Sequence, residues 1–103
     1  MANYTGRAIL ASLLFVSAIG AADGDAVFKG RCTGCHGSDG KGKSAIGTPD
    51  FTTAKTQSGI SDADIIETIT NGRKGTIMPA WKGKLSDEEI AAVAMYLRSL
   101  GRK

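Results

Sequence analysis

Two cysteines and the only histidine of the chain stand within five consecutive residues, Cys32, Thr33, Gly34, Cys35 and His36. Cysteines at this spacing lie on one side of a helical turn, where both thiols can add to the vinyl groups of a flat macrocycle. The histidine that follows is carried to the same side, where its imidazole can ligate iron in either oxidation state. The run predicts one covalently attached haem c, with thioether bonds to both cysteines and His36 as an axial ligand.

Three other kinds of site also use a pair of cysteines separated by two residues. A reducible pair of the thioredoxin kind needs alternating strands and helices, and the sequence shows no such pattern. A structural zinc site needs four ligands, and the chain has no cysteine or histidine outside the run. A disulfide across two residues closes a very small loop and constrains little of the unfolded chain. Haem attachment is therefore the favoured interpretation.

The N-terminal residues have the composition of a signal peptide. Arg7 supplies a positive charge, residues 8–19 carry none, and small residues follow as far as Ala22. The uncharged stretch is shorter than the about 20 residues that a membrane-spanning helix needs. We expect cleavage after Ala22, which gives a signal peptide, 1–22, and a mature haem-binding domain, 23–103, that is exported to the periplasm. An uncleaved anchor or a buried helix is the alternative.

The exported domain is small, and the chain as a whole is close to neutral. Domains of this size bury little surface and often need a staple, which a covalent haem provides, so we expect the haem-free chain to fold poorly. The 13 basic and 10 acidic residues of the chain give no indication of nucleic-acid binding. The basic residues that flank the haem motif are Lys29, Arg31, Lys41, Lys43, Arg73, Lys74, Lys82 and Lys84. They form either a docking rim for an acidic partner or an ordinary solvated surface.

Capping signals predict three helices. The first has Asp23 or Asp25 as its cap and runs from about residue 25 into the haem motif. The second follows Ser61 and ends at residue 70 or 71, and the third follows Ser86. In both, an acidic residue three positions after the serine completes a capping box.

Apolar side chains one turn apart mark the buried face of each of the later helices. In the second helix these are Ile65, Ile66 and Ile69. In the third helix, which we expect to end at Gly101, they are Ile90, Val93, Ala94, Leu97 and Leu100. The segment 37–48 is rich in glycine and predicts an open loop. Period-two alternation of useful length is absent, so the sequence predicts an all-α domain.

The sixth coordination position of a haem iron decides between electron transfer and chemistry on a bound ligand. Met1 is lost with the signal peptide, and Met95 lies nearly opposite the apolar stripe of the last helix. Met78 precedes Pro79, which keeps the chain extended at Met78 and can present its thioether to the iron opposite His36. We expect His36 and Met78 to be the two iron ligands, with hydrophobic packing as the alternative role for Met78.

With these features the chain resembles the class I cytochromes c, which are small soluble electron carriers with one haem. The residues that carry the resemblance are Gly24, Phe28, the run 32–36, Met78, Pro79, Ala80, Trp81 and Tyr96. The resemblance implies a cytochrome c fold, with short helices wrapped around one covalently bound haem. It also implies that Gly24 and Phe28 cross the C-terminal helix near Tyr96, where a missing side chain lets the two helices approach closely.

The resemblance implies further roles around the haem. The carbonyl group of Pro49 would accept the Nδ1 proton of His36 and fix the orientation of the ring. Trp81 would pack either against the haem edge or in the ordinary core. Arg73 and Lys74 are the candidates for pairing with the haem propionates.

The function implied is the transfer of single electrons between redox partner proteins outside the cytoplasm, by a carrier that is not an enzyme. We expect a periplasmic monomer that binds no nucleic acid and is not inserted in the membrane after signal cleavage; its donor and acceptor stay open. Two alternatives remain. One is a haem-bearing electron-entry subunit of a membrane oxidase or dehydrogenase, which an exposed apolar patch at the haem edge would favour. The other is a haem peroxidase or gas sensor, in which Met78 would be absent or labile as a ligand.

Overall fold

The computed structural model describes residues 22–102, and the predicted signal peptide, 1–22, lies outside the described residues except for its last position. The elements are α2 (Gly24–Arg31), α3 (Thr33–His36), the 3-10 turn η1 (Ser44–Ile46), α4 (Ala54–Gly59), α5 (Asp62–Asn71) and α6 (Asp87–Leu100). Across the described range the only β pairing is an isolated bridge, so the all-α prediction is confirmed. None of the helices in this range is long and apolar enough to cross a membrane.

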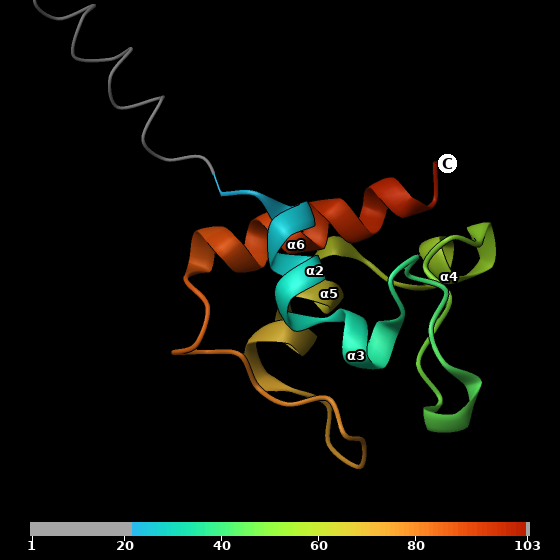
Figure 1. The fold of residues 1–103 in the computed structure, drawn as a ribbon, viewed down its shortest axis with the longest axis horizontal. Helices are drawn as coiled ribbons and strands as arrows, with labels where there is room; N and C mark the ends of the chain where they lie inside the picture. Colours follow the sequence, from blue (N-terminus) through green and yellow to red (C-terminus); the bar gives the residue numbers. More distant parts are fainter. Residues whose placement is uncertain (1–21, 103) are drawn as a thin grey trace, which may run out of the picture.

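Helices α2 and α6 cross (Figure 1), and their closest approach is at Gly24. An ideal Cβ on Gly24 would lie 2.2 Å from the carbonyl oxygen of Ala92, so the two backbones touch where a side chain is missing. One turn later Phe28 is fully buried, and its ring centroid lies 5.2 Å from that of Tyr96. The predicted crossing near Tyr96 is therefore confirmed. Asp23 caps α2 by accepting the Ala26 amide at 3.3 Å.

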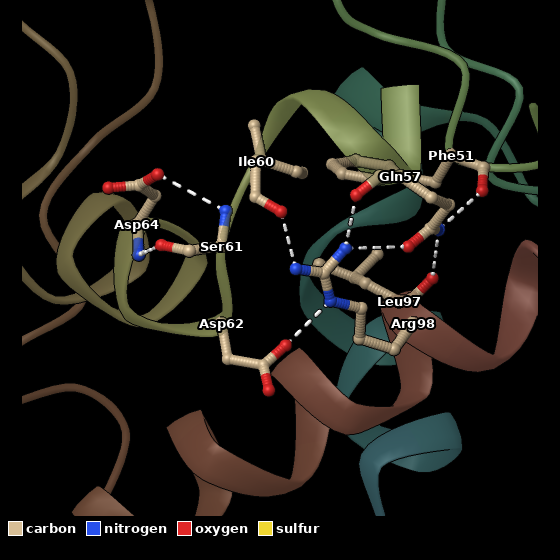
Figure 2. Close-up of polar contacts among 8 residues, drawn as sticks. All are labelled: Phe51, Gln57, Ile60, Ser61, Asp62, Asp64, Leu97 and Arg98. Atoms are coloured by element: carbon tan, nitrogen blue, oxygen red, sulfur yellow. Dashed lines mark hydrogen bonds and ion pairs between the residues drawn. The ribbon is translucent and has the colours of Figure 1, made fainter. Parts of the chain in front are cut away.

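Helices α5 and α6 begin at the residues that the capping pattern predicts. The Ser61 hydroxyl accepts the Asp64 amide at 3.0 Å, and the Asp64 carboxylate accepts the Ser61 amide at 3.1 Å (Figure 2). Ser86 and Glu89 form the same pair of bonds, at 3.1 and 2.9 Å. Helix α5 ends before Gly72, whose φ of 76° lies in the region that favours glycine. Both helices are thus delimited by local hydrogen bonds.

The buried faces agree with the predicted stripes except at one position. All five predicted residues of α6 are buried. In α5, Ile65 and Ile69 are buried, but Ile66 is 38% exposed, so its predicted burial is wrong. Successive helix residues differ by about 100° around the axis, and this rotation moves Ile66 off the face that Ile65 and Ile69 share.

Helix α4 was not predicted from the sequence. Thr53 caps it by accepting the Thr56 amide at 3.2 Å. None of its side chains is buried, so the segment lacks the apolar periodicity by which the other helices were found. The loops that follow α3 and α5 extend to the same side of the fold, below α3 in the view of Figure 1.

The close crossing predicts opposite effects for two alanine substitutions in α2. Gly24→Ala places a Cβ against backbone atoms of α6, so we expect the haem-attached protein to lose about 1–3 kcal/mol of unfolding free energy. Gly30→Ala meets no atom within 4 Å, and we expect it to gain about 0.5–1 kcal/mol, because alanine favours a helix over glycine. Urea denaturation measures both, and equal stabilities for the two variants would contradict the crossing.

Candidate functional site

A cavity of about 840 Å³ opens among α3, α5, α6 and the two loops that follow α3 and α5. Its volume lies within the about 300–1,000 Å³ of pockets that enclose small organic ligands. The four residues predicted to bind haem, Cys32, Cys35, His36 and Met78, all line it. The structure therefore brings together side chains that are separated by more than 40 positions in the sequence.

The two cysteines lie on the turn that joins α2 to α3. Cys32 is the cap between these helices and Cys35 is inside α3, and both are half-buried free thiols, not a disulfide. Burial raises the pKa of the Cys32 thiol, although the neighbouring charge of Arg31 opposes this shift. Both sulfur atoms are thus unlinked on the wall of the cavity, as addition to a ligand in that cavity requires.

His36 has a buried nitrogen without a polar partner. Its Nδ1 atom makes no hydrogen bond to any described residue, and its ring centroid lies 5.8 Å from that of Phe51. Burial lowers the pKa of His36, so the imidazole is neutral at neutral pH, which is the form that ligates a metal. Buried polar atoms are nearly always satisfied, so this nitrogen is an exception among the described residues.

The predicted hydrogen bond from His36 Nδ1 to the Pro49 carbonyl is absent, so this prediction is wrong for the structure. The physical reason is the path of the loop. The Pro49 carbonyl lies against Gly42, where an ideal Cβ would stand 2.5 Å from its oxygen. Pro49 itself lines the cavity.

The loop that carries Met78 is closed at its base by backbone hydrogen bonds. The Trp81 amide donates to the Ile69 carbonyl at 2.9 Å, and the Arg73 amide donates to the Met78 carbonyl at 3.2 Å. Met78 is half-buried against the core and lines the cavity. Met95, in contrast, is 60% exposed on α6. Of these two methionines, Met78 is the one within reach of a group held in the cavity.

Loop 42–48 caps the C-terminal end of α3, a role that was not predicted from the sequence. The carbonyl groups of the last three residues of α3 each accept one hydrogen bond from this loop: Gly34 from Lys43 Nζ at 2.8 Å, Cys35 from the Thr48 hydroxyl at 2.8 Å, and His36 from the Gly42 amide at 2.9 Å. Helices end with carbonyl groups that lack partners within the helix, so a search for their donors would have pointed to this loop. The cap fixes the turn on which Cys35 and His36 lie.

Charged residues of both signs line the cavity. Arg31 and Arg73 are the members of the predicted basic set that do so, and Asp64 and Glu67 of α5 line it as well. Lys74, the other candidate for pairing with a propionate, is exposed and is not part of the lining. The lining of the cavity is therefore mixed in charge, which does not favour the docking rim of basic residues over the alternative of an ordinary solvated surface.

Trp81 has one of the two roles considered for it, packing in the core, while packing against the haem edge stays a prediction. It packs against the hydrophobic core and also lines the cavity. The Arg31 guanidinium carbon and the Lys84 Nζ lie 5.9 and 5.7 Å from its ring centroid, within the range of cation–π attraction. These contacts orient two basic side chains beside the cavity.

Residues 20–97 match the family described as cytochrome c oxidase, cbb3-type, subunit III. Among curated relatives, the cbb3-type cytochrome c oxidase subunit FixP of Bradyrhizobium sp. (strain ORS 278) is 46% identical over 81 residues, which cover 79% of this chain and 28% of the relative. Subunit CcoP of Cereibacter sphaeroides is 39% identical over 80 residues, covering 78% and 27%. The chain thus spans less than a third of the length of these relatives.

Solved structures give the same fold. A c-type cytochrome, KustC0563, matches with a TM-score of 0.71 and 33% identity, over 77% of this chain and 98% of that one. The dihydro-heme d1 dehydrogenase NirN, in complex with DHE, matches with a TM-score of 0.64 and 30% identity, over 75% of this chain and 16% of that one. The predicted cytochrome c fold is therefore confirmed.

The cap on α3 predicts that the Thr48 hydroxyl stabilises the turn below the cavity. Thr48→Val keeps the shape of the side chain but leaves the Cys35 carbonyl without its bond, so we expect a loss of about 1–3 kcal/mol of unfolding free energy in urea denaturation. Thr70→Val is the control, because the Thr70 hydroxyl bonds the Ile66 carbonyl inside α5, where the helical backbone already engages it. A Thr48 variant no less stable than the Thr70 variant would show that the cap contributes nothing.

Proposed function

This chain belongs to the family of cbb3-type cytochrome c oxidase subunit III, and we propose that its Cys32 and Cys35 bind one haem c through thioether bonds while His36 and Met78 ligate the iron. It is a c-type cytochrome domain, its cofactor is covalently attached haem c, and its function is electron transfer. The observation that carries the residue assignment is the single cavity that all four side chains line.

The chemistry of the donor set fits this assignment. Two free thiols supply the atoms for thioether bonds, a neutral imidazole supplies a nitrogen ligand, and a thioether supplies a sulfur ligand.

When bound, the haem iron supplies exchange of one electron between its ferric and ferrous states. His36 and Met78 would both ligate the iron and so would keep a substrate from it, and we infer that the chain itself catalyses no bond-making reaction. Buried apolar residues of α5 and α6, Ile65, Ile69 and Leu97, line the cavity and exclude water from it. An apolar, water-poor cavity disfavours the ferric haem, which carries more positive charge than the ferrous haem. The cavity and the sulfur ligand would therefore both raise the reduction potential of the haem.

The electron acceptor that we propose is an oxidase of the cbb3 type, which the domain serves outside the cytoplasm, in the periplasm. The curated relatives are named as subunits of such an oxidase, which favours an electron-entry domain over an unrelated diffusing carrier. A second observation favours docking. Ile46 and Ile77 line the cavity and are 43% and 62% exposed, and apolar side chains exposed together on a rim are typical of surfaces that contact another protein.

The cysteine assignment predicts the number of thioether bonds. The alkaline pyridine spectrum of the full chain, expressed in a host that matures c-type cytochromes, should report a haem with two such bonds. Cys32→Ala and Cys35→Ala should each report one, because each thiol forms one bond. A colourless wild-type protein, or two bonds in either variant, would contradict the assignment.

The sulfur ligand predicts a difference between two methionines. Ferric haem with methionine as a ligand has a near-infrared charge-transfer band, which we expect in the wild type at neutral pH. Met78→Ala should lose this band and lower the reduction potential, because the sulfur ligand raises it. Met95→Ala, at the exposed methionine of α6, should keep both. Retention of the band in Met78→Ala would overturn the assignment, and its absence from the wild type would favour an open iron site.

A further inference from the structure

A polar cluster joins α4, the link to α5 and the last turn of α6 (Figure 2). The Arg98 side chain is 18% exposed, and its Nε donates to the Asp62 carboxylate at 2.6 Å. One terminal nitrogen donates to the carbonyl and side-chain oxygens of Gln57, at 2.6 and 3.0 Å, and the other donates to the Ile60 carbonyl. The planar fork of arginine thus engages carbonyl groups at the C-terminal end of α4 that the helix leaves without partners.

Gln57 extends the cluster in the other direction. Its side-chain nitrogen donates to the Phe51 carbonyl at 2.6 Å and to the Leu97 carbonyl at 2.9 Å. An ideal Cβ on Gly101 would lie 2.5 Å from Gln57 Cγ, so the end of α6 is packed directly on this side chain. The side-chain amide of Gln57 therefore links the segment before α4 to the last turn of α6.

The carbonyl groups that the cluster binds outside α4 belong to residues of the cavity wall. Phe51, Ile60 and Leu97 all line the cavity, and the two fastened by Gln57 are buried. The Phe51 ring is also the aromatic neighbour of His36, at 5.8 Å between centroids. The cluster lies behind the cavity wall and forms hydrogen bonds with the backbone carbonyl groups of these three wall residues.

We propose that Gln57 and Arg98 are positioning residues of the haem site, which keep the Phe51 wall closed over His36 and so keep water away from the His36 side of the iron. This inference rests on the proposed function, because it takes His36 as an iron ligand. Exclusion of water disfavours the more charged ferric state, so the cluster raises the reduction potential of a haem that neither residue touches.

The test compares reduction potentials of haem-attached full-length variants. Gln57→Met removes both donors without changing charge, and Arg98→Lys keeps the charge but loses the fork. For each we expect about a threefold rise in the ratio of ferric to ferrous protein at the wild-type midpoint, which is about 30 mV for a one-electron couple. Arg102→Lys, at an exposed arginine just beyond α6, is the matched control and should leave the ratio unchanged.

A second comparison separates positioning from stability alone. Ser86→Ala removes the capping box at the start of α6, about three helical turns from Arg98, at a residue that does not line the cavity, so it should lose stability but keep the wild-type potential. If Gln57→Met loses stability as Ser86→Ala does but keeps the wild-type potential, the cluster is only structural and the proposal is overturned. If Gln57→Met does not fold, Arg98→Lys decides by the same criterion.

The failure of this inference differs from the failure of the proposed function. A wild type without thioether-linked haem would overturn both. A wild type with two thioether bonds and the near-infrared band, whose variants keep its potential, would overturn the positioning role alone.

Discussion

The contact between the backbones of α2 and α6 at Gly24 is the constraint on which the site depends. Helix α2 continues directly into the turn that carries Cys32 and Cys35, so the place where α2 rests on α6 determines where both thiols stand. The same helix α6 contributes Leu97 to the cavity wall. A shift of the crossing would therefore move the attachment turn and one wall of the cavity relative to each other, which is why a glycine is needed there more than a larger apolar residue.

Two different forces hold the remaining parts. Helices α5 and α6 are held by buried apolar faces, while loop 42–48 and α4 have almost no buried side chains. These two segments are fixed by donors that reach backbone carbonyl groups, through Lys43 and Thr48 on one side and Gln57 and Arg98 on the other. Both sets of bonds end on or behind the cavity wall. Polar contacts thus complete a site that the small hydrophobic core does not enclose alone.

Features that depend on a few consecutive residues could be predicted from the sequence, whereas features that depend on contacts between distant residues could not. The start of α6 at Ser86 depends on four consecutive residues, and the attachment motif on five, so both were identified directly. The burial of Ile66 was predicted wrongly because three isoleucines close together do not define a face. The Pro49 bond depends on a loop path, and the contacts of Arg98 join residues 36 to 41 positions apart; neither has a signature in sequence. The roles of Cys32 and Cys35 in haem attachment, and of His36 and Met78 as iron ligands, stay predictions.

The loop between α5 and Trp81 has a dynamic consequence. Backbone bonds close it at its base, yet residues 73–77 at its tip are exposed and add nothing to the buried core. A segment of this kind opens by local fluctuation, at a free-energy cost well below that of global unfolding. The proposed sulfur ligand, Met78, directly follows this tip and is held by one of the closing bonds, whereas the proposed nitrogen ligand lies on a helix capped at its end. We therefore expect the Met78 sulfur to dissociate from the iron and rebind faster than the His36 nitrogen does.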